Sequence, residues 1–333
     1  MGSVEDYLAA FLDRFTRLIG PSLVLFALLL IGFCTFVFFA NLVPFYRHRY
    51  DQPVVVELAM IVTGVFLLFN VLYNYYKAVK VSPGFPPLKA DTLEMGGNQS
   101  PRSSAFGSRL RNYEPVDSED EWTADTDSDR RLGKGHYPVC AKCDRIRPPR
   151  THHCSVCQSC VYRFDHHCPW IYNCVGLRNY KFFYLFLLHT FLVDVFFVSL
   201  SLPVFRYSLT LPLIDPEHSL LPGAARPQVL MSFILASAVG IALILFLGFH
   251  TYLLLTNQTT MEWATSASRD EHLRERGRFR RNPYDLGRKR NWEQVFGHNS
   301  RWIWAFSFLH KDGEQDGIPS FPTVTSRSNS HQG

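Results

Sequence analysis

The sequence predicts an all-α membrane protein in which four transmembrane helices carry a cytosolic, cysteine-rich domain between the second and the third helix. Two observations predict this fold class. The apolar residues gather in long blocks flanked by charge, whereas a soluble core would spread them at helical or strand periodicity. In addition, all of the 8 cysteines except Cys34 fall between positions 140 and 174, interleaved with histidines.

Four apolar blocks are long enough to cross a bilayer, because each is near the ~20 residues that ~30 Å of hydrocarbon requires. They lie at about 19–40, 54–77, 180–204 and 229–255. Lipid offers no hydrogen-bond partner to backbone amides, so each block should form a helix. Four crossings place both termini on the same side of the membrane.

Loop charges predict the orientation of these helices. The connections at 41–53 and 206–228 carry few Lys or Arg residues, whereas residues 256–290 are rich in arginine. Because basic loops stay in the cytosol, both termini and the cysteine-rich domain are expected there. The net charge of +5 is small, and the basic residues do not form the footprint of a nucleic-acid binder, so no nucleic acid is expected as a partner.

The chain divides into segments of different composition. They are a cytosolic N-terminal segment (1–18), transmembrane helices 1 and 2 (19–77), a partly disordered acidic cytosolic linker (78–135), the cysteine-rich domain (136–179), transmembrane helices 3 and 4 (180–255), a cytosolic C-terminal region (256–312) and a disordered tail (313–333). Acidic, Gly, Ser and Pro residues dominate the linker between 91 and 135. Such a composition buries too little apolar surface to fold alone.

The cysteine-rich domain has few large aliphatic residues, so we expect metal to supply its stability. It contains Cys140-x2-Cys143, then His152-His153-Cys154-x2-Cys157-x2-Cys160, then Asp165-His166-His167-Cys168 and finally Cys174. A CxxC knuckle places two thiolates on one tetrahedral zinc ion. Two Cys3His sites would leave one thiol free, and a free thiol beside imidazoles is a favoured nucleophile. Cys168 is the best candidate, with Cys174 as the alternative.

The segment Asp165-His166-His167-Cys168, within its cysteine-rich frame, resembles the DHHC family of protein S-acyltransferases, also called palmitoyltransferases. Two further segments agree with the family. Residues Thr259-Thr260-Met261-Glu262 resemble its TTxE element, and Asn282-Pro283-Tyr284 followed by Asn291 resembles its C-terminal motif. The resemblance covers about residues 19–297 and includes the order of the helices and the cysteine-rich domain.

The resemblance implies two structural zinc ions. One would bind Cys140, Cys143, His153 and Cys160, and the other Cys154, Cys157, His167 and Cys174. Cys168 is then the free nucleophile, His166 the general base and Asp165 the group that orients it. The motif residues that would support this site are Thr259, Thr260, Glu262, Asn282, Tyr284 and Asn291.

The family also implies a ping-pong reaction with acyl-CoA as the donor. Cys168 would take a long-chain acyl group, typically palmitoyl, and pass it to cytosolic, membrane-proximal cysteines of other proteins. Exposing an acyl chain costs ~0.8 kcal/mol per CH2, so a cavity among the helices should hold it. By resemblance, Phe183 and Val193 line that cavity. The candidates for binding the coenzyme A phosphates at the cytosolic rim are Arg150, Arg163, Arg178 and Lys181.

A catalytically silent, zinc-stabilised membrane adaptor or scaffold is the alternative function. A transporter, suggested by His189 and Asp194 alone, comes third. We expect His152 to hydrogen-bond near a zinc ligand. We expect His189, Asp194 and His250 to form hydrogen bonds between helices. The family suggests an endomembrane location, the Golgi or the endoplasmic reticulum, with the plasma membrane as the alternative.

Overall fold

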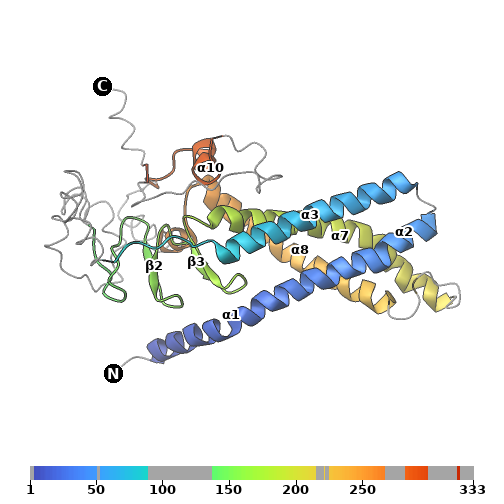
Figure 1. The fold of residues 1–333 in the computed structure, drawn as a ribbon, viewed down its shortest axis with the longest axis horizontal. Coiled ribbons are helices and arrows are strands. Elements are labelled where there is room, and N and C mark those ends of the chain that lie inside the picture. The colour runs from blue at the N-terminus through green and yellow to red at the C-terminus, as the bar shows by residue number, and fades with distance from the viewer. Residues whose placement is uncertain are drawn as a thin grey trace, which may run out of the picture.

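The computed structural model describes residues 4–50, 53–88, 137–214, 221, 225–266, 282–298 and 321–322. The acidic part of the linker (91–135) and, apart from 321–322, the tail (313–333) lie outside these residues. Figure 1 shows an elongated molecule in which long helices occupy one end and the cysteine-rich domain the other.

Within the described residues, four helices are long and apolar enough to cross a membrane, which confirms the predicted fold class. The candidate spans are Ala10–Tyr50, Val54–Lys80, Tyr180–Thr210 and Ala225–Leu255. The first consists of α1 (Val4–Val37), a π-helical turn η1 (Phe38–Leu42) and α2 (Val43–Tyr50), and the others belong to α3 (Val54–Lys80), α7 (Tyr180–Ile214) and α8 (Ala225–Leu255). The chain is therefore an integral membrane protein.

Helix α1 is longer than the apolar block that predicts it. Its N-terminal part extends past the bundle to the cysteine-rich domain (Figure 1), where the Arg17 guanidinium donates a hydrogen bond to the Ser155 carbonyl. The ring of Tyr172 occupies the space beside Gly20, and a Cβ there would lie 2.0 Å from that ring. Any residue larger than glycine at this position would displace the Tyr172 ring.

The cysteine-rich domain lies between α3 and α7 and is built from two short antiparallel hairpins. The first pairs β1 (His152–Cys154) with β2 (Ser159–Val161), and the second pairs β3 (His166–Cys168) with β4 (Asn173–Val175). The second hairpin is tied to the end of α3, because the Asn173 side chain donates to the carbonyls of Ala78 (3.1 Å), Val79 (3.2 Å) and Val81 (3.0 Å). These hydrogen bonds satisfy carbonyl groups at the C-terminus of α3 that have no partner within the helix.

The segments after α8 close over its C-terminal end. A short helix covers residues 260–266, and α10 covers Arg288–Phe296. Two asparagines cap α8, because Asn291 donates to the Leu255 carbonyl (2.7 Å) and Asn282 to the Thr256 carbonyl (2.7 Å). The polar residues of the C-terminal motif thus fix the chain where it leaves the bundle.

Candidate active site and metal centres

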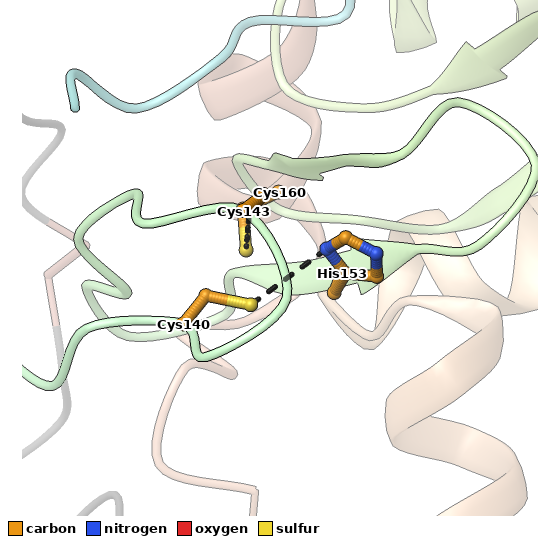
Figure 2. A group of neighbouring side chains, drawn as sticks. All are labelled: Cys140, Cys143, His153 and Cys160. Carbon is orange, nitrogen blue, oxygen red and sulfur yellow. Dashed lines mark hydrogen bonds between the residues drawn. The ribbon is translucent and has the colours of Figure 1, made fainter. Parts of the chain in front are cut away.

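The first cysteine and histidine cluster contains Cys140, Cys143, His153 and Cys160, whose ligand atoms all lie within 4.8 Å of one another. Figure 2 shows the four side chains pointing toward one another. The Cys140 Sγ atom lies 3.7 Å from His153 Nδ1, and the Sγ atoms of Cys143 and Cys160 are 3.6 Å apart. A tetrahedral zinc ion with bonds of ~2.3 Å would hold its sulfur ligands ~3.8 Å apart. The cluster therefore fits a closed Cys3His zinc site.

The second cluster contains Cys154, Cys157, His167 and Cys174, again with ligand atoms within 4.8 Å of one another. His167 Nδ1 lies 3.8, 3.4 and 3.6 Å from the sulfur atoms of Cys154, Cys157 and Cys174. All eight cysteines are free thiols, so metal rather than a disulfide explains their grouping. The two clusters coincide with the two ligand sets that the family resemblance implies, and both fit zinc.

A 14-residue repeat explains how these clusters are built. His152, His153 and Cys154 of β1 return as His166, His167 and Cys168 of β3, and the pairing repeats too. His153 pairs with Cys160 in the first hairpin and His167 with Cys174 in the second. An isolated bridge joins Val139 to Ile146, 14 residues before the pair of the first hairpin. The sequence analysis missed this repeat, although the doubled His-His-Cys triplet was its signal.

Each cluster joins the turn of one repeat to the paired His and Cys of the next. The turns begin at Cys140, Cys154 and Cys168, and in each of them the fifth residue has a left-handed backbone. These residues are Asp144 (φ 54°), Gln158 (φ 54°) and Tyr172 (φ 48°). The third turn has Ile171 where the other two have their second cysteine, and α7 follows it instead of another hairpin. Cys168 therefore lies outside both clusters.

Cys168 is buried among apolar side chains where the second hairpin meets α3 and α7. The Nδ1 atom of His166 lies 2.7 Å from the Asp165 carboxylate. Burial disfavours the imidazolium, but the hydrogen bond to Asp165 and the neighbouring Cys168 outweigh it and raise the pKa of His166. Asp165, His166 and Cys168 therefore bring a carboxylate, an imidazole and a thiol together.

The Asp165 carboxylate is fixed by the segment after α8. It accepts hydrogen bonds from the Thr260 backbone N–H (2.9 Å) and hydroxyl (2.8 Å). Burial alone would raise the pKa of Asp165, but the hydrogen bond from His166, the nearby imidazoles and the Thr260 amide lower it to about 2. The N-terminus of a helix also favours a negative charge. Asp165 is therefore ionised at neutral pH.

The TTxE element owes its conformation to a capping box. The Thr259 backbone N–H donates to the Glu262 carboxylate (2.9 Å), and the Glu262 N–H donates to the Thr259 hydroxyl (3.2 Å). This reciprocal pair starts the helix of residues 260–266. Thr260 is the first residue of that helix, so the cap directs its free N–H at Asp165.

Arg150 is buried and binds the same short helix. Its guanidinium donates to both Glu262 oxygens (2.6 and 2.7 Å) and to Asn257, and it stacks on the Tyr284 ring at 4.4 Å. Arg163 is buried as well and donates to the Asn257 side chain (3.1 Å). Both arginines were expected at the cytosolic rim, and the structure instead places them inside this polar network because it satisfies their donors.

The other predicted substrate-binding residues lie elsewhere. Arg178 is exposed just before α7, and Lys181 is half-buried in its first turn. Phe183 is buried in the cluster around Cys168, and its ring lies 5.2 Å from that of His166. Val193 is half-buried ten residues further along α7.

The remaining polar residues have different surroundings. Burial, followed by the charge of Arg147, lowers the pKa of His152 to about 4, so its ring is neutral at neutral pH. His189 Nδ1 hydrogen-bonds to the Leu185 carbonyl (2.7 Å) within its own helix. The Asp194 carboxylate lies against Gly240 of α8, where a Cβ would be 2.2 Å away. His250 lies beside the Asp165–His166 pair.

Comparison with known proteins agrees with this geometry. Residues 134–267 match the family model described as DHHC palmitoyltransferase. The chain is 36% identical over 284 residues to "Probable protein S-acyltransferase 12" of Arabidopsis thaliana, covering 83% of this chain and 84% of that protein. It is 31% identical over 290 residues to "Probable protein S-acyltransferase 14" of the same plant, covering 86% and 84%. Human "Palmitoyltransferase ZDHHC2" is 30% identical over 307 residues, covering 90% and 74%.

Proposed function

The chain belongs to the family of DHHC palmitoyltransferases, and from this premise we propose that it transfers a long-chain acyl group, typically palmitoyl, from acyl-CoA to protein cysteines through an acyl-Cys168 intermediate. The observation that carries the proposal is the state of Cys168. Among the cysteines that the structure describes in the cysteine-rich domain, it alone belongs to neither metal cluster, and it lies close enough to His166 to contribute to the raised pKa of that imidazole.

In the first step His166 takes the proton of the Cys168 thiol, and the thiolate attacks the thioester carbonyl of acyl-CoA. A new sulfur–carbon bond forms, the bond to the coenzyme A sulfur breaks, and the leaving thiolate takes the proton back from His166. Asp165 holds Nδ1 of His166 and stabilises the imidazolium while it carries that proton. Because one thioester replaces another, the enzyme mainly has to position the partners and activate the sulfur.

In the second step the thiol of a substrate protein gives its proton to His166 and attacks the acyl-Cys168 thioester. The acyl group moves to the substrate sulfur, and Cys168 leaves as a thiolate that His166 protonates again. The same three residues therefore serve both halves of a ping-pong reaction.

The two zinc ions would have a structural role. Four-ligand Cys3His sites have no open position for water or substrate, so the ions would cross-link the segments of the cysteine-rich domain. Cys140, Cys143, His153 and Cys160 would hold one ion, and Cys154, Cys157, His167 and Cys174 the other. His167 precedes Cys168 by one residue, so the second ion would also fix the strand that carries the nucleophile.

The membrane would surround the acyl chain of acyl-CoA and hold the substrate proteins near the site. The acyl chain would enter the bundle beneath Cys168, beside Phe183 and toward Val193. Arg178 and Lys181 would face the coenzyme A phosphates at the rim. The arginine-rich C-terminal region supports a cytosolic location for the cysteine-rich domain and both termini. Substrates would then be proteins with cytosolic cysteines close to an endomembrane such as the Golgi or the endoplasmic reticulum.

Purified protein incubated with labelled palmitoyl-CoA tests this proposal. The wild-type chain should acquire a hydroxylamine-labile label, and Cys168→Ser should remove that label while keeping zinc at two per chain. Cys34→Ser is the matched control, because this thiol lies in α1 outside the cysteine-rich domain, and it should keep the label. A wild-type protein that binds two zinc ions and takes up no label would instead be the zinc-stabilised adaptor.

A further inference from the structure

His250 is a second histidine at the candidate active site, and the reaction above gives it no role. It lies near the C-terminal end of α8 and is 1% exposed. One ring nitrogen of His250, one of His166 and an oxygen of Asp165 lie within 4.8 Å of one another. These three residues come from two segments about 85 positions apart, so only the folded bundle brings them together.

The imidazole of His166 is held between two helices. The Phe183 ring of α7 meets it edge-on, with centroids 5.2 Å apart and an interplanar angle of 70°. The His250 ring of α8 lies 5.9 Å away at 44°. A hydrogen bond from Nδ1 to Asp165 fixes one atom of the ring but leaves it free to tilt about that bond. Contacts with neighbouring rings restrict this tilt and so limit the directions in which the second nitrogen can point.

His250 is itself held rigidly. Its ring makes edge-on contacts with Phe246 (4.7 Å) and Phe183 (5.1 Å), and its Nδ1 atom lies 3.5 Å from the Tyr180 hydroxyl. Tyr180 and Phe183 belong to the first turn of α7, whereas Phe246 precedes His250 by one turn of α8. Side chains of both α7 and α8 therefore hold the His250 ring in place.

We propose that His250 is a positioning residue, which holds the His166 imidazole at the angle that directs its second nitrogen to the Cys168 sulfur. This inference rests on the proposed acyl transfer and deepens it. The chemistry belongs to His166, and His250 acts through that ring alone. Misplacement of a reacting group by ~1 Å can cost ~100-fold in rate, so loss of this contact should be visible in the first step.

The test uses full-length protein in nanodiscs and measures the rate of Cys168 acylation by labelled palmitoyl-CoA. His250→Leu keeps the volume but not the flat ring, and should lower the maximal rate about 10- to 100-fold with little change in the KM for palmitoyl-CoA. His250→Phe restores a ring and should recover most of that loss. The control is His189→Gln. It replaces another buried histidine, one that is not among the described contacts of His166, and should keep the wild-type rate.

A double-mutant cycle distinguishes positioning from general damage. If His250 acts through His166, His250→Leu should change the residual rate of a His166→Ala protein less than about twofold, because the two effects are not additive. The same loss in both backgrounds would overturn the inference, as would a wild-type rate in His250→Leu alone. If His250→Leu binds fewer than two zinc ions, His250→Gln is measured in its place.

Alkylation of Cys168 by iodoacetamide gives a readout independent of acyl-CoA. His250→Leu should slow it when His166 is present and leave it unchanged in the His166→Ala background. If the wild-type protein acquires no acyl label, the proposed function itself fails. If it is labelled and His250→Leu is labelled equally fast, only the role of His250 fails.

Discussion

The two hairpins of the cysteine-rich domain have nearly the same backbone and begin with the same His-His-Cys triplet, yet the triplets have different roles. In the first hairpin Cys154 belongs to a metal cluster, whereas in the second the equivalent Cys168 does not. His152 has a pKa lowered by burial, and the equivalent His166 has a pKa raised by its hydrogen bond to Asp165 and by the neighbouring Cys168. The triplet therefore does not determine the chemistry, and its neighbours do.

Two differences between the hairpins account for this outcome. Three residues after the cysteine of the triplet, the first hairpin has Cys157 and the second has Ile171. Only the first hairpin therefore contains the second cysteine of a CxxC knuckle. The residue before the triplet is Thr151 in the first hairpin and Asp165 in the second. The first difference leaves the Cys168 thiol outside both metal clusters, and the second places a carboxylate beside His166.

The largest expected effect comes from the same substitution at the two equivalent cysteines. Cys154→Ser should lower the zinc content from two toward one per chain and destabilise the domain, because loss of a metal site belongs to the changes that cost more than ~4 kcal/mol. Cys168→Ser should leave both zinc ions and the unfolding temperature unchanged. Metal analysis and thermal unfolding of the two variants check this contrast. Equal zinc loss in both would show that Cys168 is also a ligand.

Asp165→Asn should give the next largest effect. The amide cannot stabilise the imidazolium of His166, so the acylation rate of Cys168 should fall about 10²- to 10⁴-fold while two zinc ions stay bound. Thr151→Ser is the matched change before the first triplet and should leave the rate near that of the wild type. Single-turnover labelling with palmitoyl-CoA measures both. A small effect of Asp165→Asn would mean that His166 needs no carboxylate.

Ile171→Cys removes the difference that releases Cys168. It completes a third CxxC turn, which should bind added zinc and compete with acylation. Zinc at ten times its dissociation constant should lower the rate about tenfold. Ile171→Ser introduces a side chain close in size to cysteine but without a thiol, so its acylation rate should be insensitive to zinc. Acylation rates in a zinc titration compare the two variants, and equal responses would contradict the proposed origin of the free thiol.

Thr260→Val should give the smallest effect. It removes the hydroxyl that donates to Asp165 but keeps the backbone N–H, so the rate should fall about 3- to 10-fold, as expected for one hydrogen bond. Thr260→Ser keeps the hydroxyl and should retain the rate. Single-turnover acylation measures both variants. A loss of zinc in Thr260→Val would point to the fold of the short helix instead.

Much of the architecture was predictable from the sequence because it depends on local patterns. Long apolar blocks predicted the four helices, and Cys-x2-Cys spacing predicted metal sites, whereas the two sets of ligands came from the family resemblance. The limits of the helices were less clear. Residues 4–18 of α1 mix apolar and charged side chains. The continuous apolar block that predicted the helix therefore starts at residue 19, later than the helix itself.

The long-range polar pairs were not predictable from spacing. Arg150 and Glu262 are 112 positions apart, and nothing in either neighbourhood predicts their contact. Arg150 was therefore grouped with the candidates for phosphate binding, because a sequence does not show that a guanidinium is already bound. His250 was assigned to contacts between helices for the same reason, since its distance from His166 depends on how α7 and α8 pack.

The bond between Asp165 and Thr260 has a consequence for the biogenesis of the protein. The two residues are separated by both α7 and α8, so the ribosome completes the nucleophile long before it makes the helix that fixes the carboxylate. A nascent chain that has inserted only its third helix carries the thiol without this support. Acyl transfer should therefore begin only after the fourth helix has entered the membrane, which protects neighbouring proteins from modification by unfinished chains.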